Sequence, residues 1–289
     1  MFRSLLYVPA SSERFIAKAH EREADAIILD LEDSVAPGEK DKARAALGAA
    51  VPAVSRNGAK VFVRINAEDD RLLADAEAAA LAGAFGLFVP KTREPQALGR
   101  LTRHLDEVER RSGRGEQVVL IPMIEDPGAV FDARAIAAAS PRVFGLIVGG
   151  EDIATAMAAD ATPEVLRLPK LLVHMAARAA GVHSFGLLRS VADFRDGAGI
   201  EQAAHEARAF GFEGATCVHP SVVAILNRVF SPSAEEIDRA SRMIAAYEQS
   251  LAAGQGACVF EGKMIDVPVV MRARALLMKQ SLKGAAHSG

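Results

Sequence analysis

Short apolar runs alternate along the chain with longer segments rich in Ala, Glu and Arg. Several of the runs are apolar almost throughout, as expected for parallel strands that are covered on both faces. The eight runs are Arg3–Val8, Ala26–Glu32, Lys60–Asn66, Gly86–Lys91, Val118–Glu125, Val143–Asp152, Val182–Gly186 and Gly214–His219. Eight strands, each followed by a helix, predict an α/β fold and favour a closed (β/α)₈ barrel over an open doubly wound sheet.

The segment after the eighth run departs from this strand and helix period. Ser233-Ala-Glu-Glu236 matches a capping box and predicts a helix that continues to about residue 250. A glycine-rich segment and a last helix follow. We therefore expect a catalytic barrel domain over residues 1–230 and a C-terminal helical extension over residues 231–289.

Composition narrows the classes of function. The chain has 289 residues, of which 50% are hydrophobic, so it can bury a core of barrel size. Its formal net charge of −3 gives no basic footprint for nucleic acid, and no apolar run is long enough for a signal peptide or a membrane span. The two cysteines, Cys217 and Cys258, are isolated, which is typical of a reducing compartment. We expect a cytoplasmic protein whose metal ligands, if it has any, are oxygen or imidazole.

Charged residues close most of the apolar runs. In a barrel of this kind the chemistry lies at the C-terminal ends of the strands. Any one of these residues could be a helix cap or part of a rim ion pair, but several on one rim indicate a site. They are Asp30, Glu32 and Asp33, Arg64, Lys91, Glu125, Glu151 and Asp152, and His219.

Two of these carboxylates suggest a metal site. Glu125 and Asp152 end successive predicted strands, and neighbouring strands lie about 4.8 Å apart, so both can reach one ion. Two carboxylates completed by water and substrate oxygens suit Mg²⁺, and Mn²⁺ would also fit an oxygen site. Glu151 competes with Asp152. If the strand continues to this point, consecutive side chains point to opposite faces and only one of the two can face the ion.

Arg64 is a candidate anion clamp, because its planar guanidinium suits a substrate carboxylate and its charge can stabilise an enolate oxygen. The alternative is a structural ion pair with Asp30, Glu32 or Asp33 on the neighbouring strand. His219 could polarise a substrate, but a lone histidine at a strand end is more often structural, so we leave it out of the catalytic set.

Motifs spread along the chain resemble one family. In order, they are Arg3-Ser-Leu-Leu-Tyr-Val-Pro9, Glu13-Arg-Phe15, Ile28-Leu-Asp-Leu-Glu-Asp-Ser-Val35, Val63-Arg-Ile-Asn66, Pro122-Met-Ile-Glu125, Gly149-Gly-Glu-Asp152, Cys217-Val-His-Pro220 and Gly262-Lys-Met-Ile-Asp266. Together they are similar to the citrate lyase β-subunit-like, CoA-ester lyase branch of the HpcH/HpaI aldolase family. The resemblance runs from residue 3 to about residue 275.

This resemblance implies a barrel of the phosphoenolpyruvate/pyruvate type and dependence on Mg²⁺. Glu125 and Asp152 match the metal ligands, with Glu125 also at the substrate, and Arg64 matches the arginine that binds the substrate carboxylate. Asp266 matches an acid/base aspartate that, in relatives with a C-terminal extension, reaches into a neighbouring subunit's site. From the residues alone, Asp266 is equally compatible with a helix cap, because Pro268 suits a first helical turn. The resemblance also implies a homo-oligomer, either a trimer or a hexamer.

The hypothesis is retro-Claisen cleavage of a 3-hydroxy-3-carboxyacyl-CoA, such as citramalyl-CoA or malyl-CoA, into a 2-oxo acid and an acyl-CoA. Arg64 would hold the carboxylate and Asp266 would protonate the departing thioester enolate. Arg14 and Lys18, which follow the first run, are candidates for the CoA phosphates, with a solvated helix face as the alternative. Other hypotheses remain open: an aldolase acting on free 2-oxo acids, a CoA-ester thioesterase, or a β-type subunit that works only with an acyl-carrier partner.

The resemblance has local departures. Glu125-Asp-Pro-Gly128 replaces the more usual Glu-Thr-x-x-Gly, and Thr216-Cys217 stands where many relatives carry a Lys or a bulkier residue. These departures leave the predicted metal ligands in place and bear on which substrate is used.

Overall fold

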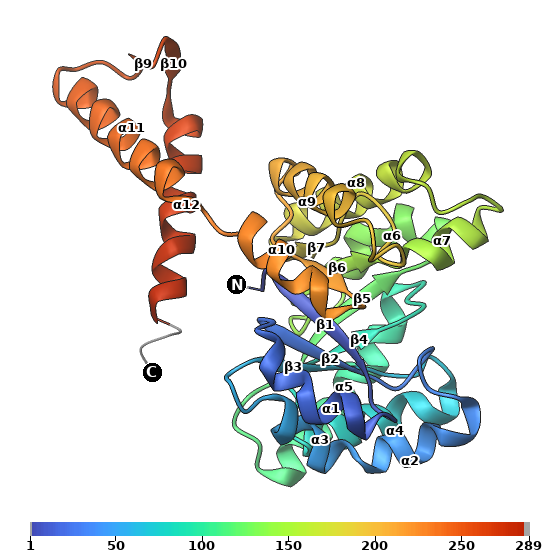
Figure 1. Ribbon diagram of the computed structural model, residues 1–289. Helices are drawn as coiled ribbons and strands as arrows, with labels where there is room; N and C mark the ends of the chain where they lie inside the picture. Colours follow the sequence, from blue (N-terminus) through green and yellow to red (C-terminus); the bar gives the residue numbers. More distant parts are fainter. Residues whose placement is uncertain (1, 286–289) are drawn as a thin grey trace. The chain divides into compact units, whose positions relative to one another are not determined.

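Figure 1 shows the computed structural model, which describes residues 2–285. The chain forms two compact units, one from Phe2 to Phe230 and the other from Ser231 onward. Each unit is described by itself.

The first unit is an eight-stranded parallel barrel. Its strands are β1 (Ser4–Pro9), β2 (Ala26–Asp30), β3 (Lys60–Arg64), β4 (Gly86–Val89), β5 (Val119–Ile124), β6 (Gly145–Val148), β7 (His183–Phe185) and β8 (Ala215–Cys217). They pair in sequence order from β1 to β7, and β8 lies beside β1. A parallel bridge between Phe185 and Gly214 brings β7 next to the start of β8 and completes the circuit. The prediction of a (β/α)₈ barrel is confirmed.

Helices connect the strands and cover the outside of the barrel (Figure 1). The α-helices are α1 (Glu13–Ala19), α2 (Lys40–Ala45), α3 (Leu47–Val54), α4 (Asp69–Leu81), α5 (Pro95–Ser112), α6 (Pro127–Ala137), α7 (Gly150–Ala156), α8 (Pro163–Ala180), α9 (Gly197–Phe210) and α10 (Val223–Val229). Short 3₁₀ turns are η1 (His20–Arg22), η2 (Pro37–Glu39) and η3 (Pro220–Val222). In the described part of the chain, no helix combines the length and the apolar character that crossing a bilayer requires.

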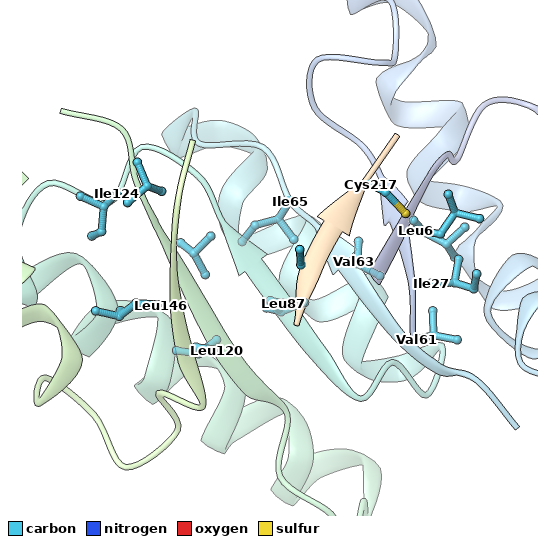
Figure 2. Packing of buried hydrophobic residues seen from close by; sticks show 14 of the residues in the cluster. Leu6, Ile27, Val61, Val63, Ile65, Leu87, Leu120, Ile124, Leu146 and Cys217 are labelled. Carbon is cyan, nitrogen blue, oxygen red and sulfur yellow. The ribbon is translucent and has the colours of Figure 1, made fainter. Parts of the chain in front are cut away.

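Alternating residues of the strands divide the core into two layers. One set points into the barrel, where Leu5, Ile28, Phe62, Phe88 and other buried residues fill the interior. The other set points outward against the helices, and Figure 2 shows part of this layer. Its labelled members are Leu6, Ile27, Val61, Val63, Ile65, Leu87, Leu120, Ile124, Leu146 and Cys217. Burial on both sides explains why the strands read as continuous apolar runs.

Most strands end earlier than the apolar runs predicted, and the largest error is at β6. The run was taken to Asp152, but β6 ends at Val148, Gly149 caps a helix, and α7 begins at Gly150. Ile153 belongs to the buried face of that helix. The glycine pair therefore marks a strand-to-helix turn inside what looked like one strand.

The second unit is a helical pair with a short hairpin. Helix α11 (Ala234–Ala252) begins with the predicted capping box, in which the Ser233 hydroxyl accepts from the Glu236 N–H. Strands β9 (Cys258–Phe260) and β10 (Lys263–Ile265) form an antiparallel hairpin that leads into α12 (Val267–Ala285). The hairpin was missed because its strands have only three residues each. Its turn residues, Glu261 and Gly262, have φ values of 46° and 76°, which suit a tight hairpin turn.

Candidate active site

A cavity of about 190 Å³ lies at the C-terminal ends of the barrel strands. Its walls include Tyr7 from β1, Arg64 from β3, Glu125 just after β5, Asp152 in α7 and Thr216 in β8. The structure thus brings three of the predicted site residues, Arg64, Glu125 and Asp152, to one cavity. This is the end of the barrel at which the chemistry was expected.

Glu125 is the most perturbed carboxyl group of this cavity. Its side chain is buried, with 7% of the residue exposed, and one oxygen, Oε2, accepts a 2.7 Å hydrogen bond from the backbone N–H of Lys91. The carboxyl lies directly over Gly149, where a Cβ would come within 2.5 Å of Glu125 Oε1, so only glycine fits there. Burial, together with the negative charges of Asp152 and Glu32, raises the pKa of Glu125 to about 8.

Asp152 and Glu151 occupy the first turn of α7 and both line the cavity. The strand ends before them, so the condition for placing their side chains on opposite faces is not met, and consecutive helical residues are separated by about 100°. The two carboxylates nevertheless differ. Glu151 Oε1 accepts a hydrogen bond from the Ser190 hydroxyl, whereas Asp152 contributes to the field that raises the pKa of Glu125. No cluster of three or more potential metal-binding His, Cys, Asp or Glu side chains occurs within residues 2–285.

Arg64 is held by carboxylates of the neighbouring strand. Its Nε and Nη2 donate to the two oxygens of Asp30 at 2.6 and 2.7 Å, and its Nη1 lies 3.0 Å from Asp33 and 3.1 Å from Glu32. The guanidinium also lies over the Tyr7 ring, with its Cζ 5.1 Å from the ring centroid. Burial alone would raise the pKa of Asp30, but hydrogen bonds from Arg64 outweigh it and hold that pKa below its usual range. The structural ion pair considered for Arg64 is present, on the wall of the cavity.

Three residues of the cavity went unrecognised from the sequence. Tyr7 and Thr216 lie in strands; Tyr7 appeared in the sequence only as part of a motif, and Thr216 only as a departure from the family pattern, and neither was assigned to the site. Burial raises the pKa of the Tyr7 phenol. Lys170 is buried inside α8, with its ammonium donating to the carbonyls of Leu187 and Arg189 at 2.8 and 2.9 Å.

Lys170 therefore ties α8 to the loop after β7, which forms one wall of the cavity. Burial lowers the pKa of its ammonium from 10.5 to about 8. The helical period places Lys170 on the same face as the buried residues Leu166, Val173 and Ala177, and this was the signal in the sequence that could have found it.

The remaining predicted residues lie away from the cavity walls or in the other unit. Arg14 and Lys18 are exposed, four residues apart on α1, and neither is among the residues lining the cavity. His219 accepts hydrogen bonds from Ser221 and stacks on Phe194, with ring centroids 4.7 Å apart, which is a local structural role.

Asp266 belongs to the C-terminal unit and stands just before α12. Its Oδ1 accepts from the backbone N–H of Val269 at 3.4 Å, as a helix cap does. The capping role considered for Asp266 is therefore present. Its predicted part in a neighbouring subunit's site stays a prediction.

Known proteins resemble the chain over nearly its whole length. It is 32% identical over 286 residues to citrate lyase subunit beta of Escherichia coli K12, covering 98% of this chain and 94% of that protein. It is 35% identical to (3S)-malyl-CoA thioesterase of Cereibacter sphaeroides, covering 96% and 94% of the two chains. The crystal structure of CitE from Mycobacterium tuberculosis, in complex with magnesium, acetoacetate and coenzyme A, matches with a TM-score of 0.75 and 29% identity, covering 96% of this chain and 97% of that one.

The magnesium complex is consistent with Mg²⁺ dependence in this family. The family model described as HpcH/HpaI aldolase/citrate lyase matches residues 3–220, which span all eight barrel strands and the cavity residues that they carry. The resemblance seen in the motifs is confirmed, and the chain is an enzyme that belongs to the HpcH/HpaI aldolase/citrate lyase family.

Proposed function

We propose that this protein is a Mg²⁺-dependent carbon–carbon lyase that cleaves, or forms, a 3-hydroxy-3-carboxyacyl-CoA such as citramalyl-CoA or malyl-CoA. The products of cleavage are a 2-oxo acid and an acyl-CoA. The observation that carries the proposal is the meeting of a buried glutamate, a second carboxylate and an arginine around one cavity. A volume of about 190 Å³ suits the acid portion of such a substrate and is too small for coenzyme A, which would lie outside it.

Glu125 and Asp152 fit a divalent cation with oxygen ligands. They are hard donors of the kind that Mg²⁺ prefers when waters and substrate complete its shell. The raised pKa of Glu125 reflects surplus negative charge in a buried place, which a bound cation would neutralise. When bound, Mg²⁺ supplies stabilisation of negative charge on the substrate's carboxylate and hydroxyl oxygens. Mn²⁺ could fill the same role.

The protein's own groups account for orientation and proton transfer. Arg64 presents a fixed positive charge to the substrate carboxylate, and its bonds to Asp30 hold the guanidinium in one orientation. In cleavage the proton of the substrate hydroxyl passes to solvent water, the C–O bond becomes a carbonyl, and the electrons of the broken carbon–carbon bond pass to the thioester enolate. Asp266 of a neighbouring chain would donate the proton that this enolate carbon takes up.

This role for Asp266 requires a homo-oligomer, which we propose to be a trimer or a hexamer. Arg14 and Lys18 would meet the phosphates of CoA outside the cavity, since both are exposed on the helix that follows β1.

The test is turnover of citramalyl-CoA and malyl-CoA by the purified protein with Mg²⁺. A lyase releases a 2-oxo acid and leaves the thioester intact, so pyruvate or glyoxylate appears without free thiol. Asp266→Asn is the informative variant, because asparagine caps a helix about as well as aspartate but cannot act as the acid. We expect it to keep its folding stability and to lose about 10²- to 10⁴-fold in rate. Near-normal turnover by Asp266→Asn would remove the residue from the mechanism.

The similarity to a malyl-CoA thioesterase favours one alternative, and the same assay separates it. A thioesterase releases free thiol and malate with no 2-oxo acid. The similarity to a citrate lyase β subunit favours another, a subunit that works with an acyl-carrier partner. That function predicts no turnover of any CoA ester by the isolated protein, and turnover when the thioester is carried on the partner.

A further inference from the structure

Lys91 contacts two carboxyl groups near the cavity, Glu125 through its backbone N–H and Glu32 through its ammonium. It follows β4 by two positions, and its backbone has a φ of 51°, in the left-handed region that side chains other than glycine rarely adopt. Such a conformation costs free energy and persists only where the surroundings enforce it. Next to it, Thr92 is buried and bonds through its backbone N–H to the Met123 carbonyl and through its hydroxyl to the Val89 carbonyl.

The strained turn directs the Lys91 backbone toward the site. Because the residue is left-handed, its N–H donates to Glu125 Oε2 at 2.7 Å, while Glu125 Oε1 faces Gly149. Among the residues that the structure describes, this is the one hydrogen bond to the Glu125 side chain. The backbone of Lys91 therefore fixes the orientation of the carboxyl that we assign to the metal.

The side chain of Lys91 acts on a second group. Its ammonium donates to Glu32 Oε1 at 2.9 Å, and the other oxygen of Glu32 lies 3.1 Å from Arg64 Nη1. Glu32 is almost fully buried, with its side chain 3% exposed, and its charge acts on Glu125 as well. Without the ammonium, the negative charge of Glu32 would be less compensated. It would then interact more strongly with Arg64 and repel the incoming substrate carboxylate.

We propose that Lys91 is a positioning residue with two separable functions: its backbone N–H presents Glu125 to the metal, and its ammonium holds Glu32 so that Arg64 remains available to the substrate. This inference rests on the proposed function, in which Glu125 binds the metal and Arg64 the carboxylate. The two functions depend on different chemistry, one on the φ angle and the other on a positive charge.

Two substitutions separate these functions. Lys91→Asn removes the ammonium but tolerates the left-handed backbone, whereas Lys91→Val removes the ammonium and strongly disfavours that backbone. Lys91→Arg keeps the charge. Glu23→Val is the matched control, because Glu23 also has a left-handed φ, of 57°, and does not line the cavity. If Lys91→Val does not fold, Lys91→Ala replaces it with a smaller backbone penalty.

The first measurement is Mn²⁺ affinity of the purified proteins, by electron paramagnetic resonance without substrate. We expect Lys91→Val to weaken Mn²⁺ binding by about 10- to 100-fold, as loss of a group that orients a metal ligand does. Lys91→Asn, Lys91→Arg and Glu23→Val should bind as the wild type does. Equal affinity in wild type and Lys91→Val would overturn the backbone function, whereas a wild type that binds no Mn²⁺ would overturn the proposed metal site itself.

The second measurement is the KM and kcat for the CoA ester that the wild type turns over. Lys91→Asn should raise KM by roughly two- to fivefold with a smaller change in kcat, because a partly exposed ion pair contributes only a modest free energy. Lys91→Arg keeps the charge and should have the KM of the wild type. If Lys91→Asn and the wild type have the same KM, the ammonium has no part in substrate binding. If Lys91→Arg is as impaired as Lys91→Asn, the charge is not what matters.

Discussion

Arg142, which is buried, and Arg64, which is partly buried, lie at opposite ends of the barrel, and their surroundings differ. At the N-terminal ends of the strands, Arg142 bonds to both oxygens of Glu109 at 2.8 and 2.5 Å and to Asp106 at 2.5 Å. Glu109 is further satisfied by the backbone N–H of Val118. We call this set the basal cluster. Both oxygens of the buried Glu109 carboxylate accept hydrogen bonds, and Arg142 supplies the compensating positive charge.

The charged residues around the cavity, which we call the rim cluster, are arranged otherwise. Arg64 pairs with Asp30, Glu32 and Asp33, and Lys91 pairs with Glu32, while Glu125 and Asp152 complete the set without an ion pair to either cation. Burial and neighbouring charge raise the pKa of both Glu125 and Glu32, the latter mainly by burial. The same residue types therefore give a closed structural ion pair at the base and a site with surplus negative charge at the rim. Burial together with this surrounding negative charge distinguishes the Glu125 carboxyl from that of Glu109, and this difference supports the proposal of a cation at the rim.

The largest effect should come from removing the rim's buried carboxylate. Glu125→Gln keeps the size of the side chain but loses a metal ligand and a negative charge. We expect lyase activity to fall by about 10³-fold or more, because a catalytic metal stabilises the transition state by several kcal/mol. The free energy of unfolding without metal should not fall, because the raised pKa leaves the metal-free Glu125 carboxyl largely protonated at pH 7 and the glutamine oxygen can still accept from the Lys91 N–H.

Urea unfolding and steady-state kinetics on the same preparation check both statements, with Glu116→Gln, an exposed glutamate at the basal end, as control. If Glu125→Gln clearly destabilises the metal-free protein, its surroundings stabilise the Glu125 carboxylate as the basal cluster stabilises that of Glu109, which would contradict the comparison.

The basal cluster should respond in the opposite way. Arg142→Met leaves Glu109 buried without its cation, and loss of one partner from a buried pair costs about 3–5 kcal/mol in the free energy of unfolding. Turnover per folded molecule and Mn²⁺ affinity should stay at wild-type values, since the residue lies at the other end of the strands. A loss of stability below about 1 kcal/mol, measured by urea unfolding, would contradict the structural assignment.

Lys170 provides a pH-dependent version of the comparison, because its buried ammonium donates to two carbonyl oxygens, whereas Arg142 donates to carboxylates. Burial lowers its folded-state pKa to about 8 from 10.5, so between these pH values the unfolded chain holds a proton that the folded chain does not. Folding stability should therefore rise with pH across this window, relative to Lys170→Met, by at most about 3 kcal/mol. Both carbonyl bonds can persist, because a neutral amine still has two donors.

Urea unfolding at several pH values between 7 and 11 measures this difference. Lys42→Met, at a lysine whose side chain is 81% exposed, should give a difference from wild type that does not change with pH. A flat difference for Lys170→Met as well would show that the folded lysine titrates as a solvated one does.

The sequence located the barrel because its strands and helices follow a simple periodicity. Apolar runs marked all eight strands, and three of the charged residues singled out near their ends, Arg64, Glu125 and Asp152, line one cavity. The strand boundaries were less predictable. At β6, the apolar character of the strand continues into the buried face of α7, and only the glycine pair at 149–150 separates them.

Other features depend on geometry that residue types do not specify. Whether Arg64 pairs with Asp30 or faces an empty cavity is a matter of side-chain conformation, and the structure shows that it does pair while lining the cavity. The left-handed backbone of Lys91 cannot be read from a lysine, which rarely adopts it. The hydrogen bonds of Lys170 are likewise not specified by its residue type, because the carbonyls that accept them belong to the loop after β7.

The smallest expected effect concerns exposed cations near the rim. Arg14 and Lys18 are exposed on α1, and each would add a screened charge to binding of the CoA phosphates. Arg14→Gln and Lys18→Gln should each raise the KM for the CoA ester by roughly two- to fivefold, with kcat nearly unchanged and the effect fading at high salt. Arg103→Gln, an exposed cation on α5, should leave KM unaltered and serves as the control. Equal KM values for all three variants and the wild type would assign Arg14 and Lys18 to a solvated helix face, the alternative that their positions in the sequence also allow.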